Sequence, residues 1–465
     1  MEKKISFMSL LILIIAAIDN VRNLPAAALS GSSLIFFFSL SALVFLIPTA
    51  MVSAELSSAF PQHGGVYQWV RLAFGKRLGM AAIWMQWVNT LVWYPTILSF
   101  IVVTSTYIID PELGASREYL VIGMLALFWG VTLINMFGMQ VSALLNNLFC
   151  IMGTMVPLFV LIALGLVWVF SGQPIQIEFT TSQLIPSFTD SSSWTALVAI
   201  MASYLGIELS GVHVHEILNP QRNFPRALLL AAAFIFVTMV LGSLAIAFVM
   251  PGEEISLIGG IMQVYSSFFK YFGLEWLTPI MTLLIVIGST GTMINWIISP
   301  AKGLANAAEY GFLPPMFVKL NKNGVASNIL IAQAALVSVF SLLFLTESIN
   351  GFYWFLTALS TELYMTMYVL MFFAALRLHY VHKDRKDCFK IPGGSFGLWC
   401  TVLLGLTGCI ATICVSFLPP PQIDVGSPLR YSLMICLGNV LTIAPLFLIY
   451  AYESKNRVLE PQSVS

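Results

Sequence analysis

The sequence predicts an all-α, polytopic membrane protein, and three observations lead to this fold class. Of the 465 residues, 58% are hydrophobic and only 9% are charged, and the mean hydropathy is +0.90. Soluble domains carry roughly a quarter of their residues as charged side chains. Apolar stretches of about 20 residues, the length that crosses a bilayer as a helix, recur along the whole chain. Short strands of alternating polarity, which would build a membrane barrel, are absent from the sequence.

Each apolar stretch is expected to be helical, because a backbone in hydrocarbon must satisfy its own N–H and C=O groups. The chain is therefore expected to form one membrane domain, residues 1–465, with twelve transmembrane helices. They are placed near residues 5–29, 32–54, 80–108, 119–138, 145–171, 194–218, 226–250, 276–300, 327–346, 351–376, 396–418 and 429–452.

The first stretch is interrupted by AAIDNVRNLP at residues 16–25. A basic start, the apolar run 5–18 and the small residues 26–28 imitate a secretory signal, but the next apolar stretch follows at once. A soluble loop is disfavoured because the run 5–18 alone is too short to cross. We therefore expect a discontinuous helix that breaks near Ile18-Asp19-Asn20, since irregular backbone at membrane depth must line a cavity or be buried in protein.

The acid and the base of this break, Asp19 and Arg22, are three residues apart. They can pair with each other on one helix face, or they can contact a bound ligand, and both roles can hold together. The sequence leaves the two interpretations open.

The sixth stretch carries a second candidate break, SYLGIELSG at residues 203–211. Gly206 and Gly211 flank Glu208 in mid-span. A glycine costs about 1 kcal/mol in a helix interior, and a carboxylate in hydrocarbon costs at least about 2.5 kcal/mol on insertion scales. The alternative is a packing glycine beside a protonated glutamate. Broken helices in corresponding positions of two halves are typical of transporters built from inverted repeats.

The charges predict the orientation. The 21 basic and 21 acidic residues give a net charge of zero, so nothing indicates a nucleic-acid partner. With the N-terminus inside, Arg117, Lys270 and Arg430 lie outside, Arg22 lies within the membrane, and every other Lys and Arg lies on the inner side. This bias predicts that both termini are cytoplasmic.

Metal and disulfide sites are not expected. The six cysteines form no CxxC pair and are typical of apolar packing. His213 and His215 are two residues apart, so they point to different sides of a helix and do not suit one metal ion. For His213, a gating role and a packing role both stay open.

Several motifs resemble the amino acid–polyamine–organocation transporters. AELSSAFPQHGGVYQWVRLAFG (54–75) is similar to the re-entrant segment and inner loop of that family, and NPQRNFPRA (219–227) to its NPxRxxPxA signature. Within the family the resemblance is closest to bacterial glutamate/GABA antiporters. It rests on SYLGIELSGVHVHEILNP (203–220), KLNKNGV (319–325), FKIPGG (389–394) and SFLPPP (416–421).

The resemblance implies a five-plus-five inverted repeat with broken helices 1 and 6. Repeat one would cover about 5–171, repeat two about 194–376, and helices 11 and 12 about 396–452. Glu208 matches an acidic position of the antiporters' sixth helix, and Tyr364 and Tyr368 match a tyrosine pair in their tenth.

Three features depart from the antiporters. Arg22 stands where they have an uncharged tyrosine, and Thr292 stands where they have a glutamate. The chain stops about a dozen residues after its last span, so their C-terminal plug is missing here, and acid gating by that plug is not expected.

Two further positions complete the candidate site. Glu362 in the tenth span is a proton-coupling candidate or an ion-pair partner of Arg22, and Thr292 and Trp296 share one face of the eighth span. The expected substrate-binding residues are Ile18, Asp19, Asn20, Arg22, Gly206, Ile207, Glu208, Thr292, Trp296, Tyr364 and Tyr368. The proton-coupling or gating candidates are Glu208, His213 and Glu362.

The expected function is secondary amino-acid transport by alternating access, as glutamate/GABA-like exchange. The alternatives are a proton-coupled symporter and a non-transporting amino-acid sensor. The half-helix N-termini would bind the substrate carboxylate, Asp19 or Glu208 its amine, and Arg22 a second carboxylate unless Asp19 neutralises it. The sequence contains no phosphate loop, so transport driven by ATP is not expected. It contains no HExxH or GxSxG motif either, so an enzyme is not expected. No cofactor is expected. The expected partners are amino acids or their decarboxylation products and the lipid bilayer of a bacterial inner membrane; a homo-oligomer is left open.

Overall fold

The computed structural model describes residues 6–60, 65–138, 151–187, 191–382 and 388–459, and these residues form helices and no β-sheet. The α-helices are α1 Phe7–Ile18, α2 Leu24–Ala28, α3 Leu34–Ser41, α4 Ile47–Ala59, α5 Val66–Phe74, α6 Lys76–Thr106, α7 Arg117–Met136, α9 Val156–Phe170, α10 Thr181–Leu184, α11 Ala196–Ala202, α12 Pro220–Val249, α13 Gly260–Phe272, α14 Thr278–Ala307, α15 Pro315–Val318, α16 Ser327–Leu342, α17 Ile349–Val381, α18 Gly394–Ser416 and α19 Pro428–Leu459. The 3-10 helices used below are η1 Val21–Asn23 and η8 Ile207–Glu216.

Eleven helical segments of the described residues are long and apolar enough to cross a membrane. They correspond to the second to twelfth predicted spans. The first predicted span does not form one helix, because α1 has only 12 residues before the chain breaks at Asp19. The all-α, polytopic class is thus confirmed, with the first span divided rather than continuous.

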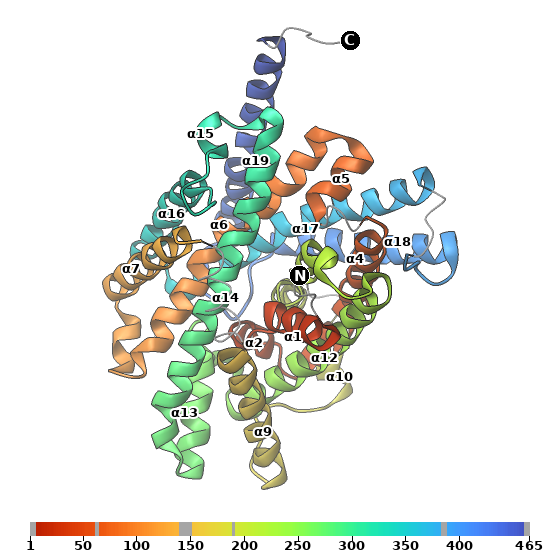
Figure 1. Cartoon of the computed structure of the whole chain (residues 1–465). Helices are drawn as coiled ribbons and strands as arrows, with labels where there is room; N and C mark the ends of the chain where they lie inside the picture. Colours follow the sequence, from red (N-terminus) through yellow and green to blue (C-terminus); the bar gives the residue numbers. More distant parts are fainter. Residues whose placement is uncertain (1–5, 61–64, 139–150, 188–190, 383–387, 460–465) are drawn as a thin grey trace.

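The centre of the bundle is formed by α6 and α17, which pack along each other; α6 also packs against α14, and α17 against α18. Both central helices are buried along most of their length. α12 packs against α1, α4 and α9. In Figure 1, α19 extends beyond its neighbours at the top of the view, toward the C-terminus.

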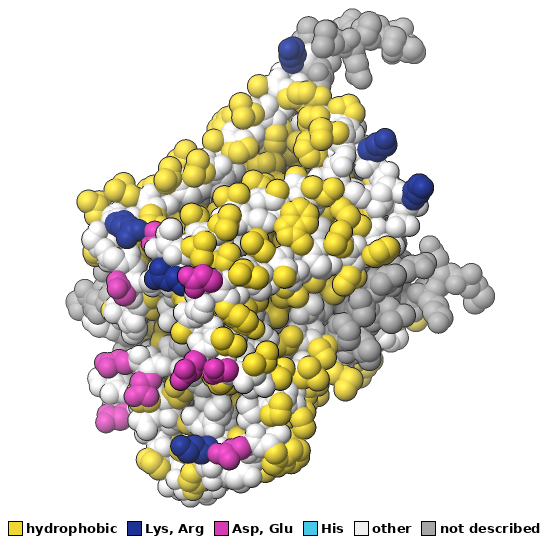
Figure 2. Space-filling view, turned by 90° about the vertical axis from the view of Figure 1, so that its left-hand side faces the viewer, with side chains coloured by type: hydrophobic (Ala, Val, Ile, Leu, Met, Phe, Trp, Pro, Cys, Tyr) yellow, Lys and Arg dark blue, Asp and Glu magenta, His cyan; other side chains and the backbone are white. Residues whose placement is uncertain are grey.

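The outer surface is apolar. Phe170, Leu448 and Leu429 are among many large hydrophobic side chains that are mostly exposed. Figure 2 shows hydrophobic side chains over much of one face, with the acidic residues gathered toward its left edge. A soluble protein rarely exposes so large a contiguous apolar area, whereas lipid contact favours it.

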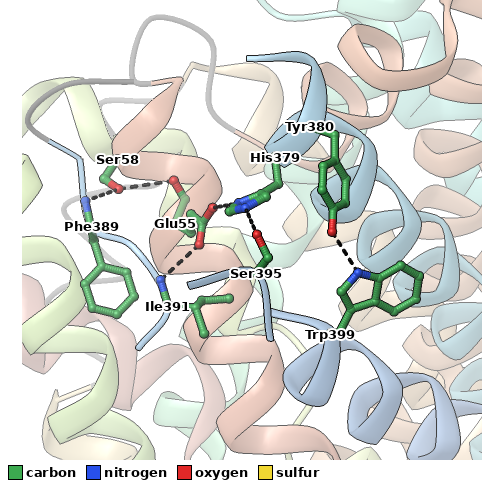
Figure 3. Close-up of polar contacts among 8 residues, drawn as sticks. All are labelled: Glu55, Ser58, His379, Tyr380, Phe389, Ile391, Ser395 and Trp399. Carbon is green, nitrogen blue, oxygen red and sulfur yellow. Dashed lines mark hydrogen bonds and ion pairs between the residues drawn. The ribbon is translucent and has the colours of Figure 1, made fainter. Parts of the chain in front are cut away.

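The connection between α17 and α18 is fixed to the end of α4 (Figure 3). Glu55 Oε2 accepts the N–H of Ile391 at 3.0 Å, and Glu55 Oε1 lies 3.4 Å from His379 Nδ1. Ser58 Oγ accepts the N–H of Phe389 at 3.1 Å. Because Glu55 is buried, its carboxylate provides acceptors that water does not supply there.

Candidate functional site

The first break lies where the sequence predicts it. Asp19 and Asn20 have extended backbone, with ψ of 116° and 121°, so α1 ends at Ile18. Asn20 Oδ1 accepts the N–H of Arg22 at 2.8 Å and so caps η1. Pro25 then stands in the first turn of α2, where its missing N–H is harmless. The predicted discontinuity of the first span is confirmed.

The predicted second break is also confirmed. α11 ends at Ala202, and η8 begins at Ile207. Between them Gly206 has φ +100°, a conformation that only glycine adopts readily. Its N–H donates to the Tyr368 hydroxyl at 3.0 Å, so this amide already has a partner within the protein.

A cavity lies between the two breaks and helices α6, α14 and α17. Six of the predicted substrate-binding residues line it, and the remaining lining residues come mainly from α6 and α17. The first group is Ile18, Asn20, Arg22, Thr292, Trp296 and Tyr364, and the second is Asn23, Asn89, Trp93, Ala202, Leu205, Thr357, Ser360 and Thr361. Among these residues Arg22 is the one with a charged side chain.

Arg22 is buried and is held by two helices. Its Nη1 donates to Thr96 Oγ1 at 2.7 Å and to the Tyr353 hydroxyl at 3.3 Å. Its guanidinium carbon lies 5.2 Å from the centre of the Trp93 ring, a distance at which a cation is attracted to the ring face. These contacts fix the positive charge at the edge of the cavity.

The hypothesis that Asp19 pairs with Arg22 is wrong. The described residues show no ion pair between them, and Asp19 Oδ2 instead accepts from Thr238 Oγ1 of α12 at 2.8 Å. Residues three apart share a face only while the backbone is helical, and here the extended Asp19 and Asn20 turn the two side chains apart. Asp19 does not line the cavity, and its Oδ1 is buried without a hydrogen-bond partner.

Glu208 lies behind the cavity wall rather than in its lining. Tyr364 donates to Glu208 Oε1 at 2.6 Å, and Tyr368 donates to Glu208 Oε2. Gln86 Nε2 lies 3.4 Å from Oε1. The resemblance to the antiporters matches Glu208 and the tyrosine pair separately, in the sixth and the tenth helix, and the structure brings these residues together as one buried network. Gly206, Ile207 and Tyr368 likewise lie outside the lining.

Glu362 does not line the cavity. Glu362 Oε2 accepts from Asn439 Nδ2 of α19 at 2.9 Å, so its side chain faces α19. The expected Glu362–Arg22 ion pair is therefore wrong: the described residues show no ion pair between these two side chains. The side chain of His213 lies outside the described residues.

The residues of α6 that line the cavity or hold its other residues were not identified from the sequence. Asn89 and Trp93 line the cavity, and Gln86 and Thr96 bind Glu208 and Arg22. These four residues are spaced by three or four, so they share one helix face. Polar residues at that spacing within an apolar span are the signal that would have identified them.

The part of the chain that the structure describes holds no group of three His, Cys, Asp or Glu side chains that would suit a metal ion. The cavity instead offers one cation, several hydroxyls and amides, and aromatic faces. Such a lining is suited to binding a small polar molecule through hydrogen bonds and one charge.

Known proteins share both the length and the pattern of this chain. Residues 5–440 match the amino acid permease family. An uncharacterized transporter of Legionella pneumophila is 38% identical over 443 residues, which cover 95% of each chain. A glutamate/gamma-aminobutyrate antiporter of Lactococcus lactis is 28% identical, covering 98% of this chain and 92% of the relative. A protein of the same species named probable agmatine/putrescine antiporter is 23% identical, covering 99% and 98%.

These matches run through both breaks and through the helices that line the cavity. The family and its named members are permeases and antiporters rather than enzymes. The chain belongs to the amino acid permease family and is a multi-pass membrane transporter of amino acids.

Proposed function

We propose that the protein is a secondary antiporter that exchanges one amino acid for another, or for its decarboxylation product, as in glutamate/GABA exchange. The substrate binds in the cavity between the two breaks, and alternating access exposes this cavity to each side of a bacterial inner membrane in turn. Both termini lie in the cytoplasm, as the distribution of Lys and Arg favours.

One observation carries the proposal. The breaks of the first and sixth spans, far apart in the sequence, border a single cavity lined by hydroxyl, amide and aromatic side chains. Irregular backbone at membrane depth is stable where it lines such a cavity, and paired broken helices are a device of transporters built from two inverted repeats. The identity to a glutamate/GABA antiporter supports exchange.

Counterflow in reconstituted vesicles tests the proposal. The purified protein is placed in vesicles that are loaded with one unlabelled amino acid, and uptake of labelled amino acid is followed for a panel of amino acids, GABA and polyamines. Obligatory exchange predicts that uptake into loaded vesicles is much faster than uptake into empty ones.

Two other results would contradict exchange. Equal uptake into empty vesicles driven by a pH step would indicate a proton-coupled symporter, with Glu208 or Glu362 as the candidate proton carrier. Amino-acid binding without flux in either assay would indicate a sensor.

A further inference from the structure

The charge of the cavity lining indicates which amino acids it accepts. Arg22 is 4% exposed and is the one charged side chain among the described lining residues. A buried cation is unfavourable unless an anion or several acceptors replace its water. The described residues give Arg22 two hydroxyl acceptors and one aromatic face, and no carboxylate.

The hydrogen bonds of Arg22 leave one edge of its guanidinium free. Both hydrogen bonds of its side chain to described residues use Nη1, which donates to Thr96 and Tyr353. Nε is buried without a hydrogen-bond acceptor, and no described residue accepts from Nη2. Nε and Nη2 form a planar pair of donors that matches the two oxygens of a carboxylate.

The same lining offers a substrate amine no opposite charge. Asp19 faces α12 and Glu208 is held by two tyrosines, so neither carboxylate lines the cavity. An amine there meets neutral oxygens, such as those of Thr361 and Tyr364. A site with a single positive charge favours a net negative ligand and disfavours a diamine, because like charges brought together in a desolvated site repel.

We infer that Arg22 determines specificity, and that the cavity selects amino acids with a second carboxylate over their neutral amides and over polyamines. Glutamate and aspartate belong to this class. Thr96 and Tyr353 are positioning residues, because they hold Nη1 and so direct the free edge of Arg22 toward the ligand. The inference rests on the proposed amino-acid exchange and names its substrate class.

The preference is measured by counterflow with labelled L-glutamate as the probe. Unlabelled L-aspartate, L-glutamine, L-asparagine and putrescine are added as competitors. Glutamine has nearly the shape of glutamate without its charge, so the ratio of their half-inhibiting concentrations isolates the second carboxylate. A charged hydrogen bond predicts a ratio of roughly 10 to 150 in favour of the acid.

Two substitutions of Arg22 separate charge from geometry. Arg22→Gln should bring the glutamate-to-glutamine ratio close to one. Arg22→Lys keeps the charge but loses the planar pair of donors, so it should retain only part of the preference. Arg430→Gln is the matched control, because Arg430 pairs with Glu347 and is not in the cavity lining; it should keep the wild-type ratio.

Thr96→Val tests the positioning role and also covers the case in which Arg22 variants do not fold. Thr96 does not line the cavity, and its hydroxyl accepts from Nη1 at 2.7 Å. Its loss should reduce the glutamate-to-glutamine ratio severalfold with little change in the affinity for glutamine. A purely structural role would instead change both affinities alike.

The outcomes distinguish this inference from the exchange that it rests on. If wild-type protein exchanges glutamine as well as glutamate, the inference is overturned and antiport is left intact. The same holds if the preference for glutamate over glutamine survives Arg22→Gln. If no amino acid is exchanged, antiport fails, and thermal stabilisation of the purified protein then decides. Stabilisation by glutamate over glutamine that Arg22→Gln removes supports the inference, and equal stabilisation by both overturns it.

Discussion

Replacing Glu208 by glutamine tests whether this carboxylate braces the wall of the cavity or contacts the substrate. The carboxylate only accepts hydrogen bonds. One of its oxygens accepts from the hydroxyl of Tyr364 and the other from the hydroxyl of Tyr368. Each hydroxyl in turn accepts an N–H, from Gln86 at 3.1 Å and from Gly206 at 3.0 Å. Glutamine has one oxygen acceptor in place of two, so one tyrosine hydroxyl loses its acceptor.

An unsatisfied buried polar group costs about 1–3 kcal/mol. We expect Glu208→Gln to lower the free energy of unfolding by about that amount and to slow exchange. Substrate affinity should change by less than about threefold, because Glu208 is not in the cavity lining. The two quantities are measured by unfolding of the purified protein in one fixed detergent and by the concentration dependence of exchange.

Glu362→Gln is the matched control. Its carboxylate is also buried in a span, but it accepts a hydrogen bond from the amide of Asn439. The side-chain oxygen of a glutamine can still accept this hydrogen bond. The opposite result for Glu208→Gln, a loss of affinity of roughly tenfold or more with unchanged stability, would show that Glu208 contacts the substrate and would refute the reasoning.

Three further predictions follow from the geometry. Gly206→Ala should abolish exchange in folded protein, because φ +100° strains any L side chain by about 1–2 kcal/mol and the added carbon would lie 3.0 Å from the Trp296 ring; normal exchange rates would contradict this. The effects of Asp19→Asn and Arg22→Gln on exchange should add to within about 0.5 kcal/mol, because the two side chains have separate partners; recovery of transport in the double variant would show that they pair. Glu55→Ala should lower the free energy of unfolding by about 1–3 kcal/mol, because it removes the acceptor of a buried backbone N–H; Glu55→Gln should retain most of this stability, and equal losses would contradict the assignment.

The spans and both breaks were predictable because each depends on a local property of the chain. Hydropathy determines which segments cross a bilayer, and an acid beside a base or a glycine beside a carboxylate is unfavourable in a continuous helix there. Asn20 and Gly206 accordingly stand at the interruptions, one as a cap and one with positive φ.

The directions of side chains at the breaks were not predictable from the same signals. Whether Asp19 meets Arg22 or Thr238 depends on how α1 is rotated against α12, and that rotation follows from packing between segments more than 200 residues apart. The same holds for Asn89 and Trp93, which belong to the site only because the middle of α6 packs beside both breaks. Resemblance identified Glu208 and its tyrosine pair but did not show that Tyr364 lies in the cavity lining while Glu208 and Tyr368 lie outside it.

The attachment of the α17–α18 connection to α4 has a mechanical consequence. Among the described residues, polar contacts join Ile391 and His379 to Glu55 and Phe389 to Ser58, and the Phe60 and His382 rings meet edge to face. Hydrogen bonds contribute about 0.5–1.5 kcal/mol each, so separating the two parts would cost roughly the few kcal/mol that divide the conformers of a typical two-state protein. We therefore expect the end of α17, the start of α18 and the end of α4 to move together, so that a displacement of one is transmitted to the other two.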